Sequence, residues 1–196
     1  MPVFWNHRIG LRPFEDPLTD AEIEKIYRWS RDDQVLHWSG GSPTDLTLNE
    51  FRARIRNDQH DPIIHRRAFF ILLRDHAIIG RVGVFAIDAE KREGELGIAI
   101  GEPSHWGQGY GRQAIQLMLE KLFQTTELNR IYLYTFPQNI RAQHCFAACG
   151  FRALATARRF SPDLGEYDGI EMEITRNDWL TPSNPHNQIQ ISQDAK

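Results

Sequence analysis

Three glycines alternate in the segment SHWGQGYG, directly before a run with helical character. Gly107, Gly109 and Gly111 allow the backbone to adopt positive φ and to approach a ligand closely. The amides of this loop can therefore point at one place, and the start of the following helix adds unpaired N–H groups and the positive end of the helix dipole. This combination predicts a binding site for a phosphate or pyrophosphate group.

Three kinds of phosphate-binding loop compete for this pattern. A P-loop requires Gly-Lys followed by Ser or Thr, whereas the chain has Gly111-Arg112-Gln113, so no hydroxyl is placed for magnesium. The spacing Gly109-x-Gly111-x-x-Ala114 fits a dinucleotide pattern. That pattern also expects an acidic ribose-binding residue about 20 positions later, and the strand-like run RIYLYTF offers none there. The dinucleotide interpretation is therefore disfavoured, and coenzyme A is the third candidate.

The elements that must position the loop follow from periodicity. Residues 93–101 (EGELGIAIG) predict the strand before it, and the helical spacing of apolar residues in RQAIQLMLEKLF predicts the helix after it. A further strand is expected over 130–136, followed by a short helix over 139–149 that ends at Gly150.

The remaining elements come before and after this centre. Alternation predicts a first strand over 7–14, and two capping boxes, Thr19 with Glu22 and Thr47 with Glu50, predict two helices. The Gly- and Asp-rich segment between those helices, which holds Trp38, is predicted to be a loop. The runs AFFILLRD with AIIGRVGVFAID, and FRALATARRF with EYDGIEMEIT, each predict a hairpin. Strands and helices around one sheet predict an α/β (α+β) domain.

Composition limits the class of protein. A chain of 196 residues with 41% apolar and 25% charged residues is expected to fold as one domain, here residues 1–180, followed by a polar, disordered tail over 181–196. The formal net charge of −3 disfavours nucleic-acid binding. No apolar run approaches the roughly 18 residues of a membrane span, so a cytoplasmic protein without a membrane partner is expected. Cys145 and Cys149 are four positions apart, which suits buried thiols better than a disulfide or metal motif.

Four segments in order carry a resemblance to a known family. They are EGELGIAIG, WGQGYGRQA, NIRAQHCFAACGF and GEYDGIEMEITRNDW, and together they resemble the GNAT superfamily of N-acetyltransferases. The similarity is greatest to the branch that contains ribosomal-protein alanine and spermidine acetyltransferases. It extends over about residues 7–180.

The resemblance implies a fold, a co-substrate and a set of binding residues. The fold would be a three-layer domain with a central twisted mixed sheet of about seven strands and helices on both faces, in which the fourth and fifth strands splay apart to admit pantetheine. Acetyl-CoA would be the co-substrate, and no metal is implied. The residues implied to bind the coenzyme are the pyrophosphate loop Trp106, Gly107, Gln108, Gly109, Tyr110, Gly111 and Arg112, the strand backbone of Gly97, Ile98, Ala99 and Ile100, and Asn139 near the thioester.

The chemical difficulty lies in the acceptor amine. An alkylamine with a pKa near 10.4 is neutral in only roughly one molecule in 2,500 at pH 7, so a general base must remove the proton. Glu95 lies fourteen residues before Gly109, the spacing at which some family members carry a catalytic glutamate. We therefore expect Glu95 to be the base, with Glu93 on the same strand face as the second candidate.

Two positions depart from the family pattern. Phe146 stands where many members have a tyrosine that protonates the leaving thiolate, so that role falls to water, Cys145 or another group. Trp106 stands where Gln or Arg is common, and Arg112 is the candidate for the missing positive charge. The amides near Ile98 to Ile100 are expected to stabilise the oxyanion.

The acceptor is expected to be a primary amine, in a peptide N-terminus, a polyamine or another small molecule. Residues 29–45 and 161–168 would border its entrance and carry acidic side chains that attract cations: Asp32, Asp33, Asp45, Asp163, Glu166 and Asp168. The alternative function is a non-catalytic acyl-CoA-binding module of the same fold. The choice between monomer and homodimer stays open at this point.

Overall fold

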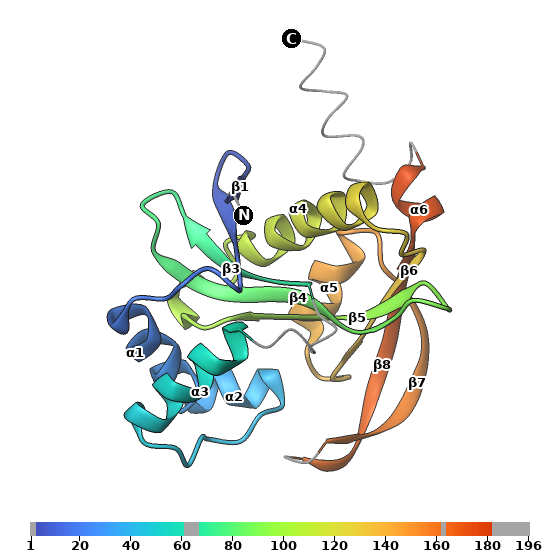
Figure 1. Cartoon of the computed structure of the whole chain (residues 1–196). Helices are drawn as coiled ribbons and strands as arrows, with labels where there is room; N and C mark the ends of the chain where they lie inside the picture. The colour runs from blue at the N-terminus through green and yellow to red at the C-terminus, as the bar shows by residue number, and fades with distance from the viewer. Residues whose placement is uncertain (1–2, 61–66, 162–163, 182–196) are drawn as a thin grey trace.

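The computed structural model describes residues 3–60, 67–161 and 164–181. Its sheet has eight strands in the order β1-β2-β3-β4-β5-β6-β8-β7 (Figure 1). The strands are β1 (Phe4–Trp5), β2 (Ile9–Pro13), β3 (Arg67–Leu73), β4 (Ile78–Asp88), β5 (Glu93–Ile100), β6 (Arg130–Thr135), β7 (Arg152–Ser161) and β8 (Gly165–Thr175). The helices are α1 (Asp20–Trp29), α2 (Asp33–Ser39), α3 (Leu48–His60), α4 (Tyr110–Thr125), α5 (Ile140–Ala147) and α6 (Arg176–Leu180), with a 3-10 turn, η1, at Pro103–His105.

The predicted fold class is confirmed, with helices on both faces of one mixed sheet. Figure 1 shows α4 on one side of the sheet and α1, α2 and α3 on the other. Between α4 and the sheet lies the larger apolar core, which includes Ile115, Met118, Leu119 and Ile131. A smaller core under α1 and α3 includes Ile23 and other buried apolar residues. The sheet has eight strands rather than about seven because the two-residue β1 pairs with β2.

Two short helices were not expected from the sequence. The segment predicted to be a loop around Trp38 contains α2, which begins because the Asp32 carboxylate accepts hydrogen bonds from the amides of Gln34 and Val35. It ends at Gly40, whose φ of 71° is left-handed. The second helix, α6, begins with a capping box at Thr175. The predicted tail over 181–196 lies, apart from Thr181, outside the described residues.

The sheet opens between β5 and β6. These two strands are parallel neighbours, and their pairing runs from Glu93 opposite Arg130 to Glu95 opposite Tyr132. Beyond this point β5 stays paired only with β4, through Ile100 opposite Gly80, while β6 stays paired with β8. The backbone edge of β5 that faces β6 is therefore left without a strand partner from residue 96 to 100, which matches the splayed strands that the resemblance implied.

Candidate active site

The glycine loop lies at the start of α4, and its residues Gly107, Gln108 and Gly109 are exposed. Gly107 and Gly109 have φ of 72° and 82°, a conformation that favours glycine. Gly109 is the N-cap of α4, and no side chain accepts a hydrogen bond from the helix start. The amides of the first turn, which have no acceptor within the helix, are therefore available to an anion. A Cβ at Gly107 would have no atom within 4 Å, so the loop surface is open there.

Trp106 anchors this loop to the end of β5. Its indole Nε1 donates a hydrogen bond of 2.8 Å to the carbonyl oxygen of Ile100. The guanidinium of Arg141, in the first turn of α5, lies 4.2 Å from the centre of the Trp106 ring and 5.8 Å from that of Trp38. Sequence reasoning proposed Arg112 as the substitute cation and missed Arg141, because a contact between α5 and the loop has no local sequence signal.

Asn139 and Phe146 have structural roles in α5. The Asn139 side chain is buried, and its Oδ1 caps the helix by accepting a hydrogen bond of 3.1 Å from the amide of Ala142. Phe146 is also buried and packs against Phe151 with 5.9 Å between ring centres. The Phe146 ring therefore belongs to the core.

A thiol lies against the glycine loop beside Phe146. A Cβ built on Gly111 would be 3.8 Å from the Cys145 sulfur and equally far from the end of Ile98, so Cys145 faces the junction of β5 and α4. A hydrogen bond with the buried Cys149 thiol lowers the pKa of Cys145, and Arg112 and Arg141 act in the same direction. That hydrogen bond, together with burial, raises the pKa of Cys149. Cys145 is thus the more acidic of two reduced thiols.

Glu95 stands at the last pair before β5 and β6 part. Burial raises the pKa of its carboxyl group, and the nearby guanidinium of Arg159 opposes that shift. The side chain keeps 33% of its surface exposed, and Arg159 Nη2 lies 3.5 Å from its Oε2. A half-buried carboxylate with a raised pKa at this junction has the properties of a general base.

Glu93, the second candidate base, is engaged elsewhere. The Arg130 guanidinium donates to Glu93 at 2.8 Å, and to Glu171 and Glu173 at 2.6 Å each. Arg152 adds a second cation to Glu173. This network joins β5, β6 and β8 on the sheet face opposite α4, next to Glu95. Glu93 is therefore held as a structural carboxylate, and Glu95 remains the better candidate.

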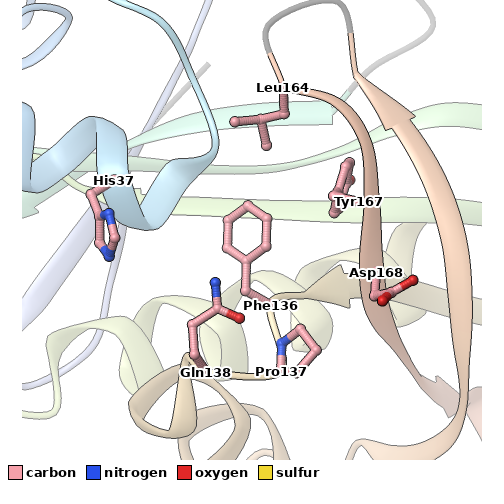
Figure 2. Close-up of a pocket in the computed structure, with 7 residues that line it drawn as sticks. All are labelled: His37, Phe136, Pro137, Gln138, Leu164, Tyr167 and Asp168. Atoms are coloured by element: carbon pink, nitrogen blue, oxygen red, sulfur yellow. The ribbon is translucent and has the colours of Figure 1, made fainter.

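A pocket of about 430 Å³ opens between α2, the loop after β6 and the β7–β8 hairpin. Figure 2 shows the seven residues that line it: His37, Phe136, Pro137, Gln138, Leu164, Tyr167 and Asp168. Described residues of both segments expected to border the acceptor entrance line this pocket: His37 from 29–45, and Leu164, Tyr167 and Asp168 from 161–168. The contribution of residues 136–138 was not expected. Tyr167 pairs across the hairpin with Arg159, whose guanidinium reaches Glu95, so two contacts connect the pocket to the candidate base.

The acidic residues of these segments are mostly occupied. Asp32 caps α2, and Arg158 lies 3.4 Å from Glu166 and 3.1 Å from Asp168. Asp163 lies outside the described residues. These contacts weaken the expectation that the acids serve to attract a cation.

Within the part of the chain that the structure describes, none of the helices combines the length and the apolar character needed to cross a bilayer. Among the same residues, no group of three or more His, Cys, Asp or Glu side chains is placed to hold a metal ion.

Comparisons with known proteins agree with this architecture. The model of the acetyltransferase (GNAT) domain family matches residues 8–152. An uncharacterised N-acetyltransferase, p20, of Bacillus licheniformis is 30% identical over 173 residues, which cover 88% of this chain and 94% of the relative. The spermidine N(1)-acetyltransferase of Vibrio cholerae is 33% identical over 146 residues, covering 74% and 80%.

Solved structures support the same fold. The crystal structure of the V. cholerae spermidine N-acetyltransferase in complex with CoA and spermine superposes with a TM-score of 0.74 at 24% identity, over 90% of this chain and all of that one. A putative acetyltransferase from T. thermophilus also reaches 0.74, at 21% identity, over all of this chain and 98% of that one. Together with the open β5 edge and the glycine loop, the family match shows that this chain belongs to the GNAT family and is an acetyl-CoA-dependent N-acetyltransferase.

Proposed function

We propose that the chain acetylates the primary amine of a small molecule that enters the pocket of Figure 2, with Glu95 as the general base. The observation that carries this proposal is the position of Glu95. It lies where β5 and β6 part, its pKa is raised by burial, and it contacts Arg159, which pairs with the pocket residue Tyr167.

The coenzyme would bind on the α4 side of the opening. In this arrangement the loop amides from Gly107 to Arg112 hold the pyrophosphate, since the Trp106 amide already donates to the Pro103 carbonyl. The free edge of β5 over Gly97 to Ile100 pairs with the pantetheine amides. The unpaired first turn of α4 and the unpartnered β5 edge support this assignment. The predicted contacts of Asn139 and Phe146 with the thioester end remain a proposal, since Asn139 Oδ1 caps α5 and the Phe146 ring packs against Phe151.

The chain's own residues would then divide the chemistry. Acetyl-CoA supplies an activated acyl group. Glu95 accepts the proton of the ammonium, directly or through a water molecule, and so provides the neutral amine that attacks. Backbone amides of Ile98 to Ile100 donate to the carbonyl oxygen as negative charge develops there. Cys145, on the loop side of α5, or water returns a proton to the leaving thiolate.

The size of the pocket suits an acceptor that inserts one small group. A space of about 430 Å³ suits a single small amine or the first residue of a peptide. The relative from V. cholerae is named for spermidine, which supports small amines as a class. Peptide N-termini are the next candidates. A cytoplasmic location, a single domain over 1–180, and a monomer or homodimer remain predictions.

The first experiment compares thermal unfolding with acetyl-CoA, NAD and ATP. At a ligand concentration of 100 times Kd, binding adds about 2.7 kcal/mol to the free energy of unfolding. Each kcal/mol raises the Tm of a chain of this size by roughly 2–4 °C. A rise with acetyl-CoA alone justifies a screen of amines for CoA release. Binding of acetyl-CoA without turnover of any amine would favour the non-catalytic alternative, and stabilisation by NAD instead would refute the coenzyme assignment.

A further inference from the structure

Arg159 contacts the candidate base Glu95 and the ring of Tyr134 on β6. It belongs to β7 and pairs with Tyr167 on β8. Its guanidinium stacks over the Tyr134 ring at 3.8 Å from the ring centre and reaches Glu95 at 3.5 Å. The preceding residue, Arg158, points the other way and pairs with Glu166 and Asp168. Arg159 therefore places a positive charge beside the candidate base, at the position opposite the pocket residue Tyr167.

The hydrogen bonds of Arg159 are incomplete. Its Nε is buried and has no hydrogen-bond partner among the described residues. Its ion pair with Glu95 is a single long contact, whereas Arg130 makes three contacts of 2.6–2.8 Å with three carboxylates. A buried donor without a partner is costly. Arg130 is thus satisfied by its surroundings and Arg159 is not.

The other carboxylates on this side of the sheet do not compete for Arg159. Arg130 and Arg152 hold the carboxylates of the network, Glu93, Glu171 and Glu173. Asp168, at the edge of the pocket, is paired with Arg158. The Arg159 guanidinium therefore keeps donors for an anion that arrives with a ligand.

We propose that the acceptor is an amino acid whose carboxylate binds Arg159 while its amine faces Glu95. This inference rests on the proposed function. Glu95 and Arg159 form a negative and a positive group at 3.5 Å, which is the complement of an α-ammonium group next to an α-carboxylate. The aromatic and aliphatic side chains of Phe136, Leu164 and Tyr167 line the neighbouring pocket and suit an apolar side chain.

The arrangement fits the chemistry of both groups. A guanidinium binds a carboxylate through two parallel hydrogen bonds, which a single long contact to Glu95 does not use. When the substrate carboxylate engages Arg159, it partly neutralises the cation that lowers the pKa of Glu95, which offsets the pKa-lowering effect of the arriving ammonium group.

The test uses acceptors that differ only in the carboxylate. We expect kcat/KM for CoA release to be at least tenfold higher with phenylalanine or leucine than with the corresponding amide, compared per neutral amine because amidation lowers the amine pKa. Spermidine serves as an acceptor without a carboxylate. Arg159→Met, which keeps an apolar stem over Tyr134, should lower the ratio of kcat/KM for the acid to kcat/KM for the amide to about one. Arg159→Lys, which keeps the positive charge but lacks the paired donors of a guanidinium, should retain part of the preference for the acid.

Arg54→Met is the matched control. Arg54 is exposed on α3, so this variant loses the same charge without touching the sheet face and should keep the wild-type preference. Unfolding scans establish that each variant folds. Equal kcat/KM for acid and amide in the wild type, a preference for spermidine, or a carboxylate preference that survives in Arg159→Met would each overturn this inference while leaving the acetyltransferase intact. Failure with every amine, despite acetyl-CoA binding, would overturn the proposed function itself.

Discussion

Replacement of Glu95 by Gln removes one negative charge from the junction of β5 and β6 without changing the size of the side chain. If Glu95 is the base, kcat/KM for CoA release should fall by about 10²- to 10⁴-fold, the usual contribution of a general base. This corresponds to about 2.7–5.4 kcal/mol of transition-state free energy. Acetyl-CoA affinity should stay unchanged, because the coenzyme would meet the edge of β5 and the glycine loop rather than this carboxylate.

The stability of the same variant should move in the other direction. Burial raises the pKa of Glu95 in the folded chain, so the fold is favoured when this group is protonated. This contribution to stability is fully present below the pKa of Glu95 in the unfolded chain. It is lost as pH rises through the pKa of Glu95 in the folded chain. At neutral pH the wild type therefore carries the cost of an ionised, half-buried carboxylate, which Gln avoids. The Tm of Glu95→Gln should equal or exceed that of the wild type at pH 7.

The pH dependence supplies the sharpest assay. In the wild type, kcat/KM should rise with pH through the pKa of Glu95, at a pH above the ordinary carboxyl range because burial raises that pKa. In Glu95→Gln, the residual kcat/KM should no longer rise with pH over this range. Unchanged turnover in Glu95→Gln, or the same rise of kcat/KM with pH in this variant, would show that Glu95 is not the base. A fall in activity accompanied by an equal loss of acetyl-CoA binding would indicate structural damage instead.

Three further substitutions test the supports of the site. Trp106→Phe keeps a ring beneath Arg141 but loses the hydrogen bond to the Ile100 carbonyl, which is worth about 0.5–1.5 kcal/mol. Acetyl-CoA binding, measured by calorimetry, should therefore weaken about two- to tenfold. Unchanged affinity and Tm would show that Trp106 does not anchor the loop. Arg130→Met leaves the Glu173 carboxylate and its neighbours without their shared cation. The free energy of unfolding should fall by about 3 kcal/mol, which lowers Tm by roughly 6–12 °C. An unchanged Tm would mean that the carboxylates find other partners. Gly109→Ala forces a side chain into φ of 82° at a cost of about 1–2 kcal/mol, and a Tm equal to the wild type would show that the loop adopts another conformation easily.

The local features of the site could be predicted from the sequence. The glycine loop, the strand before it and α4 after it each depend on neighbouring residues: positive φ at glycine, alternation in the strand, and helical spacing in α4. The order of four such segments also predicted the family. The helix α2 was missed because its start depends on one side-chain cap at Asp32 rather than on a strong periodic pattern.

The composition of the acceptor side depended on the tertiary structure. Glu95 and Arg159 are 64 positions apart and meet only because β8 and β7 follow β6 in the sheet order. Leu164 and His37 likewise share a pocket with Phe136 because α2 and the hairpin close over the loop after β6. The amino-acid sequence thus determined the coenzyme loop through short-range conformational preferences, whereas strand order and register alone decided which charged groups face the acceptor.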